Sequence, residues 1–128
     1  VSLGANPNQV INAFKEAKEY NGPSIIIAYA PCIEHGLKNG MGTSEQESKE
    51  ATLSGYFPIF RYNPANKKFT LDSSADFEKY EEFLMNESRY KVLEKTNPLE
   101  KDMLIEKNKE EAINRYEFYK NKMEKNNG

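Results

Sequence analysis

Apolar residues recur with helical spacing near the start of the chain. The first group lies at i, i+1, i+4 and i+7 and consists of Val10, Ile11, Phe14 and Ala17. Asn6 is a favourable N-cap residue, and Pro7 fits the first helical turn because its missing N–H is not needed there. Asn21-Gly22-Pro23 should end the helix, with the glycine in the left-handed region. The pattern therefore predicts one helix between Asn6 and Asn21.

The next segment, SIIIAYA over residues 24–30, is apolar at successive positions, as is typical of a strand covered on both faces. The opening VSL reads as the end of another strand that leads into a turn. A strand end, a helix and a buried strand make up half of a doubly wound unit, so we predict an α/β fold with a partial doubly wound sheet. Because the chain opens within a strand and without Met, we expect it to be a piece of a longer protein.

The middle of the chain predicts a helix and two extended segments. SEQE at residues 44–47 matches a capping box, with Ser44 as N-cap and Glu47 reaching back, and this helix should end near Gly55. YFPIFRYNP and FTLDS read as extended segments, with a turn over residues 63–66 between them. Pro58 and Pro64 confine the first of these segments to an edge strand or to an extended stretch outside a sheet.

Beyond Ser73 the sequence becomes helical and highly charged. Ser74 can cap a helix that carries Phe77, Tyr80 and Leu84 on one side. A further helical stretch with Tyr90 and Leu93 should stop near residues 97–98. The last predicted helix has a thin apolar stripe made of Ile105, Ala112, Tyr116, Tyr119 and Met123. Residues 74–128 hold 11 basic and 13 acidic side chains, against 4 and 6 in residues 1–60. We therefore predict an α/β part over residues 1–73 and a helical extension over residues 74–128.

Composition narrows the class of protein. The 128 residues suit one domain or less, and the mean hydropathy of -0.85 favours solvated helices or a partner surface. The net charge of -2 and the lack of a basic patch argue against nucleic acid, and no apolar run is long enough for a membrane span. A single cysteine excludes an internal disulfide framework and suits a reducing, cytoplasmic compartment.

Cys32 is the main candidate for chemistry, because it stands at the carboxyl end of the predicted strand, where ligands bind in open α/β sheets. Three interpretations stay open on the residues alone. Cys32 could be a small buried residue, a nucleophile paired with His35, or one ligand of an iron–sulfur cluster whose other ligands lie elsewhere. The glycine-rich residues 36–42 also permit a phosphate site, although their spacing matches no phosphate-binding motif. The paired carboxylates Glu81-Glu82 and Glu110-Glu111 read as solvated helix faces.

Several motifs in order carry a resemblance to a known family. These are VSLGANPNQVINAFKEAKEYNGPSIIIAYAPCIEHGL, GMG, SGYFPIFRYNP and FTLDS, with FLMNESRYKVL in the helical part. In these stretches the chain resembles the carboxy-terminal part of the thiamine-diphosphate-binding domain of pyruvate:ferredoxin (flavodoxin) oxidoreductases. The resemblance covers nearly the whole chain and is clearest over residues 1–73.

The resemblance implies a cofactor role for a few residues. Cys32 matches the family cysteine that supplies the fourth ligand of a [4Fe-4S] cluster, and the nearby residues Ile33, Gly40, Met41 and Gly42 would line that cluster. His35 sits where the family varies, so it is given no role. The thiamine diphosphate and Mg²⁺ ligands of the family would lie outside these 128 residues.

The resemblance also implies a function for the longer protein. It would be a cytoplasmic homodimer that oxidatively decarboxylates pyruvate with coenzyme A to acetyl-CoA and CO2. It would pass the electrons through [4Fe-4S] clusters to ferredoxin or flavodoxin. We expect the 128 residues alone to be inactive. The alternative is a stand-alone α/β–helical interaction module or subunit with no catalysis of its own.

Overall fold

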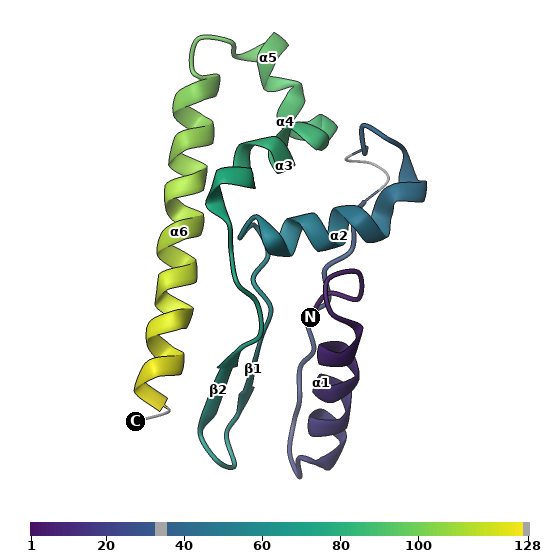
Figure 1. The fold of residues 1–128 in the computed structure, drawn as a ribbon, viewed down its shortest axis with the longest axis vertical. Helices are drawn as coiled ribbons and strands as arrows, with labels where there is room; N and C mark the ends of the chain where they lie inside the picture. Colours follow the sequence, from purple (N-terminus) through teal and green to yellow (C-terminus); the bar gives the residue numbers. More distant parts are fainter. Residues whose placement is uncertain (33–35, 127–128) are drawn as a thin grey trace.

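The computed structural model describes residues 1–32 and 36–126. Long helices flank a short hairpin: α6 runs along one side of the molecule, β1 and β2 lie in the middle, and α1 lies on the other side (Figure 1). The elements are α1 (Pro7–Glu19), η2 (Met41–Thr43), α2 (Ser44–Leu53), β1 (Phe60–Asn63), β2 (Lys68–Leu71), η3 (Phe77–Lys79), α3 (Tyr80–Asn86), α4 (Ser88–Lys91), α5 (Leu93–Thr96) and α6 (Lys101–Asn126). The predicted α/β composition and helical carboxy-terminal part are confirmed.

The helix predicted at the start of the chain is confirmed as α1. The Asn6 side chain accepts a hydrogen bond from the Gln9 backbone N–H at 2.9 Å, and Pro7 is the first helical residue. The end of the helix differs from the prediction. Tyr20 is already extended, and Gly22 does not adopt a positive φ.

The two extended segments of the middle region are confirmed as an antiparallel hairpin. β1 pairs with β2 from Phe60 opposite Leu71 to Asn63 opposite Lys68, across the predicted turn. Three aromatic rings form a mutual cluster: the Phe60 ring lies 5.2 Å from Phe69 on β2 and 4.5 Å from Tyr119 on α6, and the last two rings lie 6.0 Å apart. The aromatic contacts therefore attach the hairpin to α6.

One hydrophobic core joins α2, α3 and α6. Its buried members are Ala51, Tyr80, Phe83, Leu84, Ile105 and Ala112. The stripe predicted on the last helix is confirmed, since Ile105 and Ala112 are buried and Tyr116, Tyr119 and Met123 are half-buried. The charged face of α6 is left to solvent.

The strand predicted over residues 24–30 is not formed in the described structure. The segment is extended but belongs to no sheet, and its side chains are largely exposed, Ile25 to 88% and Ile27 to 69%. Its one pairing is with Val1, which donates to the Ile27 carbonyl at 2.8 Å and accepts from the Tyr29 N–H at 3.0 Å. This alternation is the hydrogen-bond pattern of a parallel pair. Tyr29 of this segment packs against the core, but the described residues supply no layer over Ile25 and Ile27. The cover on both faces that the prediction assumed is therefore missing here.

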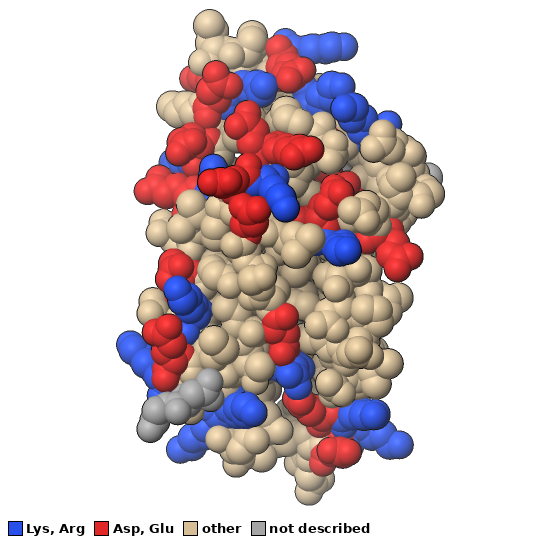
Figure 2. All heavy atoms as spheres, in the orientation of Figure 1, with Lys and Arg blue, Asp and Glu red and all other residues tan. Residues whose placement is uncertain are grey.

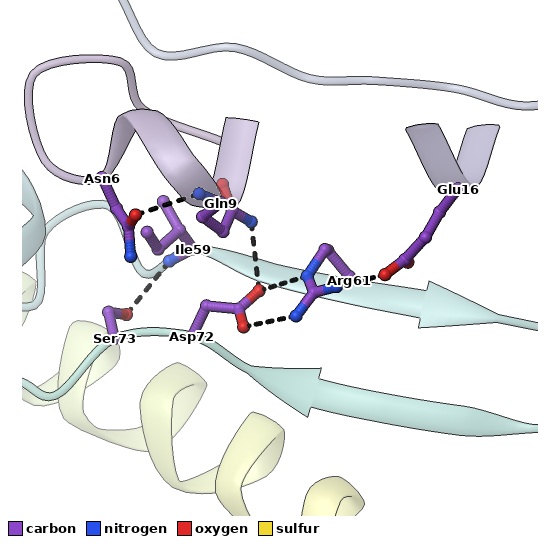
Figure 3. A network of polar contacts seen from close by, with 7 residues as sticks. All are labelled: Asn6, Gln9, Glu16, Ile59, Arg61, Asp72 and Ser73. Carbon is purple, nitrogen blue, oxygen red and sulfur yellow. Dashed lines mark hydrogen bonds and ion pairs between the residues drawn. The ribbon is translucent and has the colours of Figure 1, made fainter. Parts of the chain in front are cut away.

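The apolar stripe predicted on α1 is only partly buried. Gln9 and Ala13 are the buried residues of the helix, while Ile11 and Phe14 are 52% and 58% exposed. α1 faces the hairpin with polar side chains instead: Gln9 donates to Asp72 at 3.1 Å, and Glu16 pairs with Arg61 (Figure 3). The buried face of α1 therefore lies beside the predicted stripe rather than on it.

Two predicted helix caps are wrong. Thr43 rather than Ser44 is the N-cap residue of α2, and the Glu47 side chain does not reach back to it. Asp76 rather than Ser74 caps the next helical segment, accepting from the Glu78 N–H at 3.1 Å. In both places several polar residues compete for the cap, and packing decides among them.

Candidate functional site

Cys32 lies at the carboxyl end of the extended segment, as the sequence predicted, and it is exposed. Among the described residues the Cys32 thiol is therefore not buried, in contrast to the first of the three interpretations. Tyr29, three residues earlier, points inward and packs 5.0 Å from Phe57. Tyr29 thus anchors the segment to the core, while the Cys32 thiol at its end is accessible.

The glycine-rich region after Cys32 is described only in part. Ile33 and His35 lie outside the described residues. Gly40 has a φ of 81°, which a residue with a side chain rarely adopts, and it precedes the short helix η2 with Met41 and Gly42. A Cβ at Gly40 or Gly42 would meet no described atom within 4 Å, so these glycines border open space. No hydrogen bond among the described residues joins Cys32 to this region.

A buried polar network borders the same region. Glu87 is only 3% exposed, and its carboxylate accepts from the Tyr29 hydroxyl at 3.2 Å and pairs with Arg89. Arg89 also donates to the Tyr56 hydroxyl at 2.6 Å, which in turn lies 2.9 Å from the Tyr90 hydroxyl. Burial and the adjacent Glu87 carboxylate raise the pKa of Tyr29, so that this hydroxyl stays a proton donor.

Glu47 on α2 is a second buried carboxyl group close to this network. It is 5% exposed, and its Oε1 atom has no hydrogen-bond partner in the described part of the chain. Burial, together with Glu50 and Glu87, raises the pKa of Glu47 from 4.5 to about 7. The sequence pattern predicted Glu47 only as part of a helix cap, and it did not single out Glu87, whose partner Tyr29 is far from it in sequence.

Among the described residues, Cys32 is the thiol that a metal centre could use. Over residues 1–32 and 36–126 no group of three or more His, Cys, Asp or Glu side chains could hold a metal ion. A [4Fe-4S] cluster takes four ligands, usually thiolates. An exposed thiol such as Cys32 fits as one of these ligands, with the others supplied from elsewhere.

One well-formed cavity lies away from Cys32, which is not among its lining residues. It is a groove of about 810 Å³ between α1, the hairpin and α6, and Ile25, Ile26 and Ile27 form part of its wall. Arg61 also lines it, held by Asp72 through paired hydrogen bonds of 2.7 and 2.9 Å (Figure 3). Residues 25–27, which belong to the exposed apolar segment, form part of its wall. We therefore relate the groove to the uncovered surface of that segment and not to a site at Cys32.

The surface carries both signs of charge. On the face shown in Figure 2, Lys and Arg side chains lie among Asp and Glu side chains. The paired carboxylates Glu81-Glu82 and Glu110-Glu111 are exposed, which confirms them as solvated helix faces. No helix in residues 1–32 or 36–126 is both long and apolar enough to cross a membrane.

The amino-acid sequence of the chain is similar to segments of several known proteins. No family model matches it. A pyruvate-flavodoxin oxidoreductase of Enterobacter agglomerans is 42% identical over 94% of this chain and 11% of its own length. A pyruvate:ferredoxin oxidoreductase of Moorella thermoacetica is 42% identical over 94% and 10%, and the mitochondrial NADP-dependent pyruvate dehydrogenase of Euglena gracilis 39% over 93% and 7%. The chain thus spans about a tenth of the length of these curated relatives, and the resemblance seen in the sequence is confirmed.

Proposed function

We propose that this chain, which is homologous to one segment of the pyruvate:ferredoxin (flavodoxin) oxidoreductases, works as part of such an enzyme. The match over nearly the whole chain carries this proposal. The longer protein would oxidatively decarboxylate pyruvate with coenzyme A to acetyl-CoA and CO2, and pass the electrons to ferredoxin or flavodoxin. Thiamine diphosphate and Mg²⁺ would be held by residues outside this segment.

Within that enzyme, Cys32 would supply one ligand of a [4Fe-4S] cluster. Two observations support this role: the thiol is exposed, and it stands at the carboxyl end of the extended segment. When bound, the cluster would accept and release single electrons. The contribution of this chain would be to hold the thiolate in place and to border the site with Gly40, Met41 and Gly42.

The same proposal includes a larger sheet. The two hydrogen bonds of Val1 with Ile27 and Tyr29 follow the parallel pattern, with α1 as the connecting helix. Backbone groups of alternate residues point to opposite edges of a strand, so those of Ile26 and Ala28 face away from Val1. Residues 24–30 would be a strand of a doubly wound, thiamine-diphosphate-binding-type sheet that the rest of the longer protein completes. Residues 1–73 would belong to that domain, and residues 74–128 would extend over it or over the second subunit of a homodimer.

The cluster assignment can be tested in the full-length oxidoreductase. Cys32→Ser should remove one cluster, about four iron atoms per chain, and leave thiamine diphosphate content unchanged. Iron and sulfide quantitation with EPR of the reduced enzyme measures the first effect, and cofactor extraction measures the second. A variant with full iron content and normal ferredoxin reduction would show that Cys32 is not a ligand.

The shorter chain gives a second test. Anaerobic iron and sulfide reconstitution of the 128 residues should yield no stoichiometric cluster, because Cys32 supplies only one of the ligands. A stoichiometric [4Fe-4S] signal would contradict the proposal and favour a stand-alone module that assembles its own site between copies.

A further inference from the structure

Glu87 stands between the two helical stretches that the sequence predicts over this region. α3 ends at Asn86 and α4 begins at Ser88, and Glu87 between them has extended backbone angles, φ -93° and ψ 124°. The backbone of Glu87 forms an isolated antiparallel bridge with Leu37. The break therefore exists where the chain pairs with residues 36–38 instead of continuing its helix.

This bridge holds the chain just after Cys32. The Lys38 N–H donates to the Asn86 carbonyl at 3.0 Å, and the Ser88 N–H donates to the Gly36 carbonyl at 3.2 Å. Gly36 has a φ of 64°, and a Cβ there would come within 2.9 Å of the Ser88 hydroxyl. Only glycine permits this approach without a shift in the chain.

The side chain of Glu87 holds the chain just before Cys32. Its Oε1 accepts from the Tyr29 hydroxyl, and its Oε2 is paired with Arg89, which is itself bonded to Tyr56. Tyr56 in turn lies edge-on to Tyr29, with ring centroids 6.4 Å apart. One buried residue therefore contacts the chain on both sides of the thiol.

We propose that Glu87 is a positioning residue for Cys32: its carboxylate and its backbone hold the two segments that flank residues 33–35. This inference rests on the proposed function of Cys32 as a cluster ligand. A buried charged hydrogen bond contributes more than a neutral one, and a ligand held at both flanks moves less when the charge of its metal centre changes. Glu87 would act through the chain and touch neither substrate nor metal.

The test uses the full-length oxidoreductase with Glu87→Gln and Tyr29→Phe. Glu87→Gln keeps the shape of the side chain and removes its charge, while Tyr29→Phe removes only the hydroxyl that reaches it. Asp72→Asn is the matched control, because Asp72 also forms a partly buried pair with an arginine, but on the hairpin. Two quantities are measured for each variant. The first is the rate of hydrogen exchange at the Lys38 and Ser88 amides. The second is the reduction potential of the cluster to which Cys32 is proposed to bind.

Glu87→Gln should speed exchange at both amides by about ten- to a hundredfold, since local opening becomes easier when a charged hydrogen bond is lost. It should also shift the potential of that cluster with its iron content intact. Tyr29→Phe should shift the potential less, and Asp72→Asn should change neither quantity. Wild-type exchange and potential in Glu87→Gln would overturn the positioning role.

The two proposals fail in different ways. If Cys32→Ser keeps all its iron, the ligand assignment is wrong, and the shift in potential has no basis. If Cys32→Ser loses one cluster and Glu87→Gln behaves like Asp72→Asn, only the positioning role of Glu87 is wrong.

Discussion

At the scale of single residues, Glu47 is a carboxyl group whose charged form is disfavoured by its surroundings. Its carboxyl group is buried next to Glu87, and one of its oxygens has no hydrogen-bond partner within the described residues. Burial and the neighbouring carboxylates favour the protonated acid and raise its pKa to about 7. The folded chain therefore holds this proton across a pH range in which the unfolded chain has lost it.

This difference predicts a pH-dependent effect of Glu47→Gln. Between pH 4.5 and about 7 the folded state binds more protons at this position than the unfolded state, so wild-type stability falls as the pH rises. The variant lacks this loss. Its free energy of unfolding should exceed that of the wild type by about 1–3 kcal/mol at pH 8, and by less at pH 5.

Urea unfolding of the 128-residue chain at the two pH values measures this effect. Glu45→Gln is the control, because Glu45 lies on the exposed side of the same helix. Parallel pH profiles for Glu47→Gln and the wild type would show that the Glu47 carboxyl group is not perturbed.

At the scale of elements, polar contacts attach α1 to the hairpin. Arg61 on β1 bonds both oxygens of Asp72 and also reaches Glu16 on α1 (Figure 3). Hydrogen bonding to Asp72 raises the pKa of Arg61, so the guanidinium stays charged. The side chains of Arg61 and Asp72 are only 21% and 12% exposed. Each charge has therefore lost most of its contact with water and is stabilised by the opposite charge of the other.

Arg61→Met should therefore lower the free energy of unfolding by about 1–3 kcal/mol, since it leaves Asp72 partly buried without its cation. Lys120→Met is a matched control: Lys120 lies 4.0 Å from Glu117, and both side chains are about half exposed. Its effect should stay below about 0.5 kcal/mol in the same thermal or urea unfolding experiment. Equal effects of the two substitutions would show that the Arg61 network adds nothing to the contact between α1 and the hairpin.

The elements that the sequence predicted correctly are those with local causes. The Asn6 cap and Pro7 define the start of α1, and the turn residues define the hairpin. Glu47 and residues 24–30 were predicted wrongly because distant packing decides them: Glu47 turns inward, and the apolar segment has no cover among the described residues. The position of Cys32 at the end of its segment was correct, while Glu87 was missed because its partners Tyr29 and Leu37 are far from it in sequence.

At the scale of the whole molecule, the core and the uncovered surface lie in different places. The core joins α2, α3 and α6, whereas α1 and residues 24–30 expose Ile11, Phe14, Ile25 and Ile27. Exposed apolar surface of this kind usually marks a contact with other protein. The open side of the molecule is thus the side on which the proposed larger sheet would lie.

Ile27→Asp should have different effects on the stability of the isolated chain and of the longer protein. In the 128 residues Ile27 is 69% exposed, so the substitution should change the free energy of unfolding by no more than about 0.5 kcal/mol. In the full-length oxidoreductase the same change should cost about 2 kcal/mol or more, because an unpaired charge would be buried in a covered strand. Unfolding of both proteins, with Lys67→Asp at the exposed hairpin turn as the control, provides the comparison. A negligible effect in both would exclude a covered strand at this position.

The pairing of Val1 with the extended segment also bears on the order of folding. Its ends lie 26 residues apart, whereas the hairpin closes across a four-residue turn, and the core that contains both Ala51 and Ala112 spans a much longer stretch. Closing a chain costs more entropy as the separation grows, so nearby contacts form first. The hairpin and the unit around α1 can therefore form early and separately. We therefore expect α6, which contacts β2 and α3, to pack after these local units have formed.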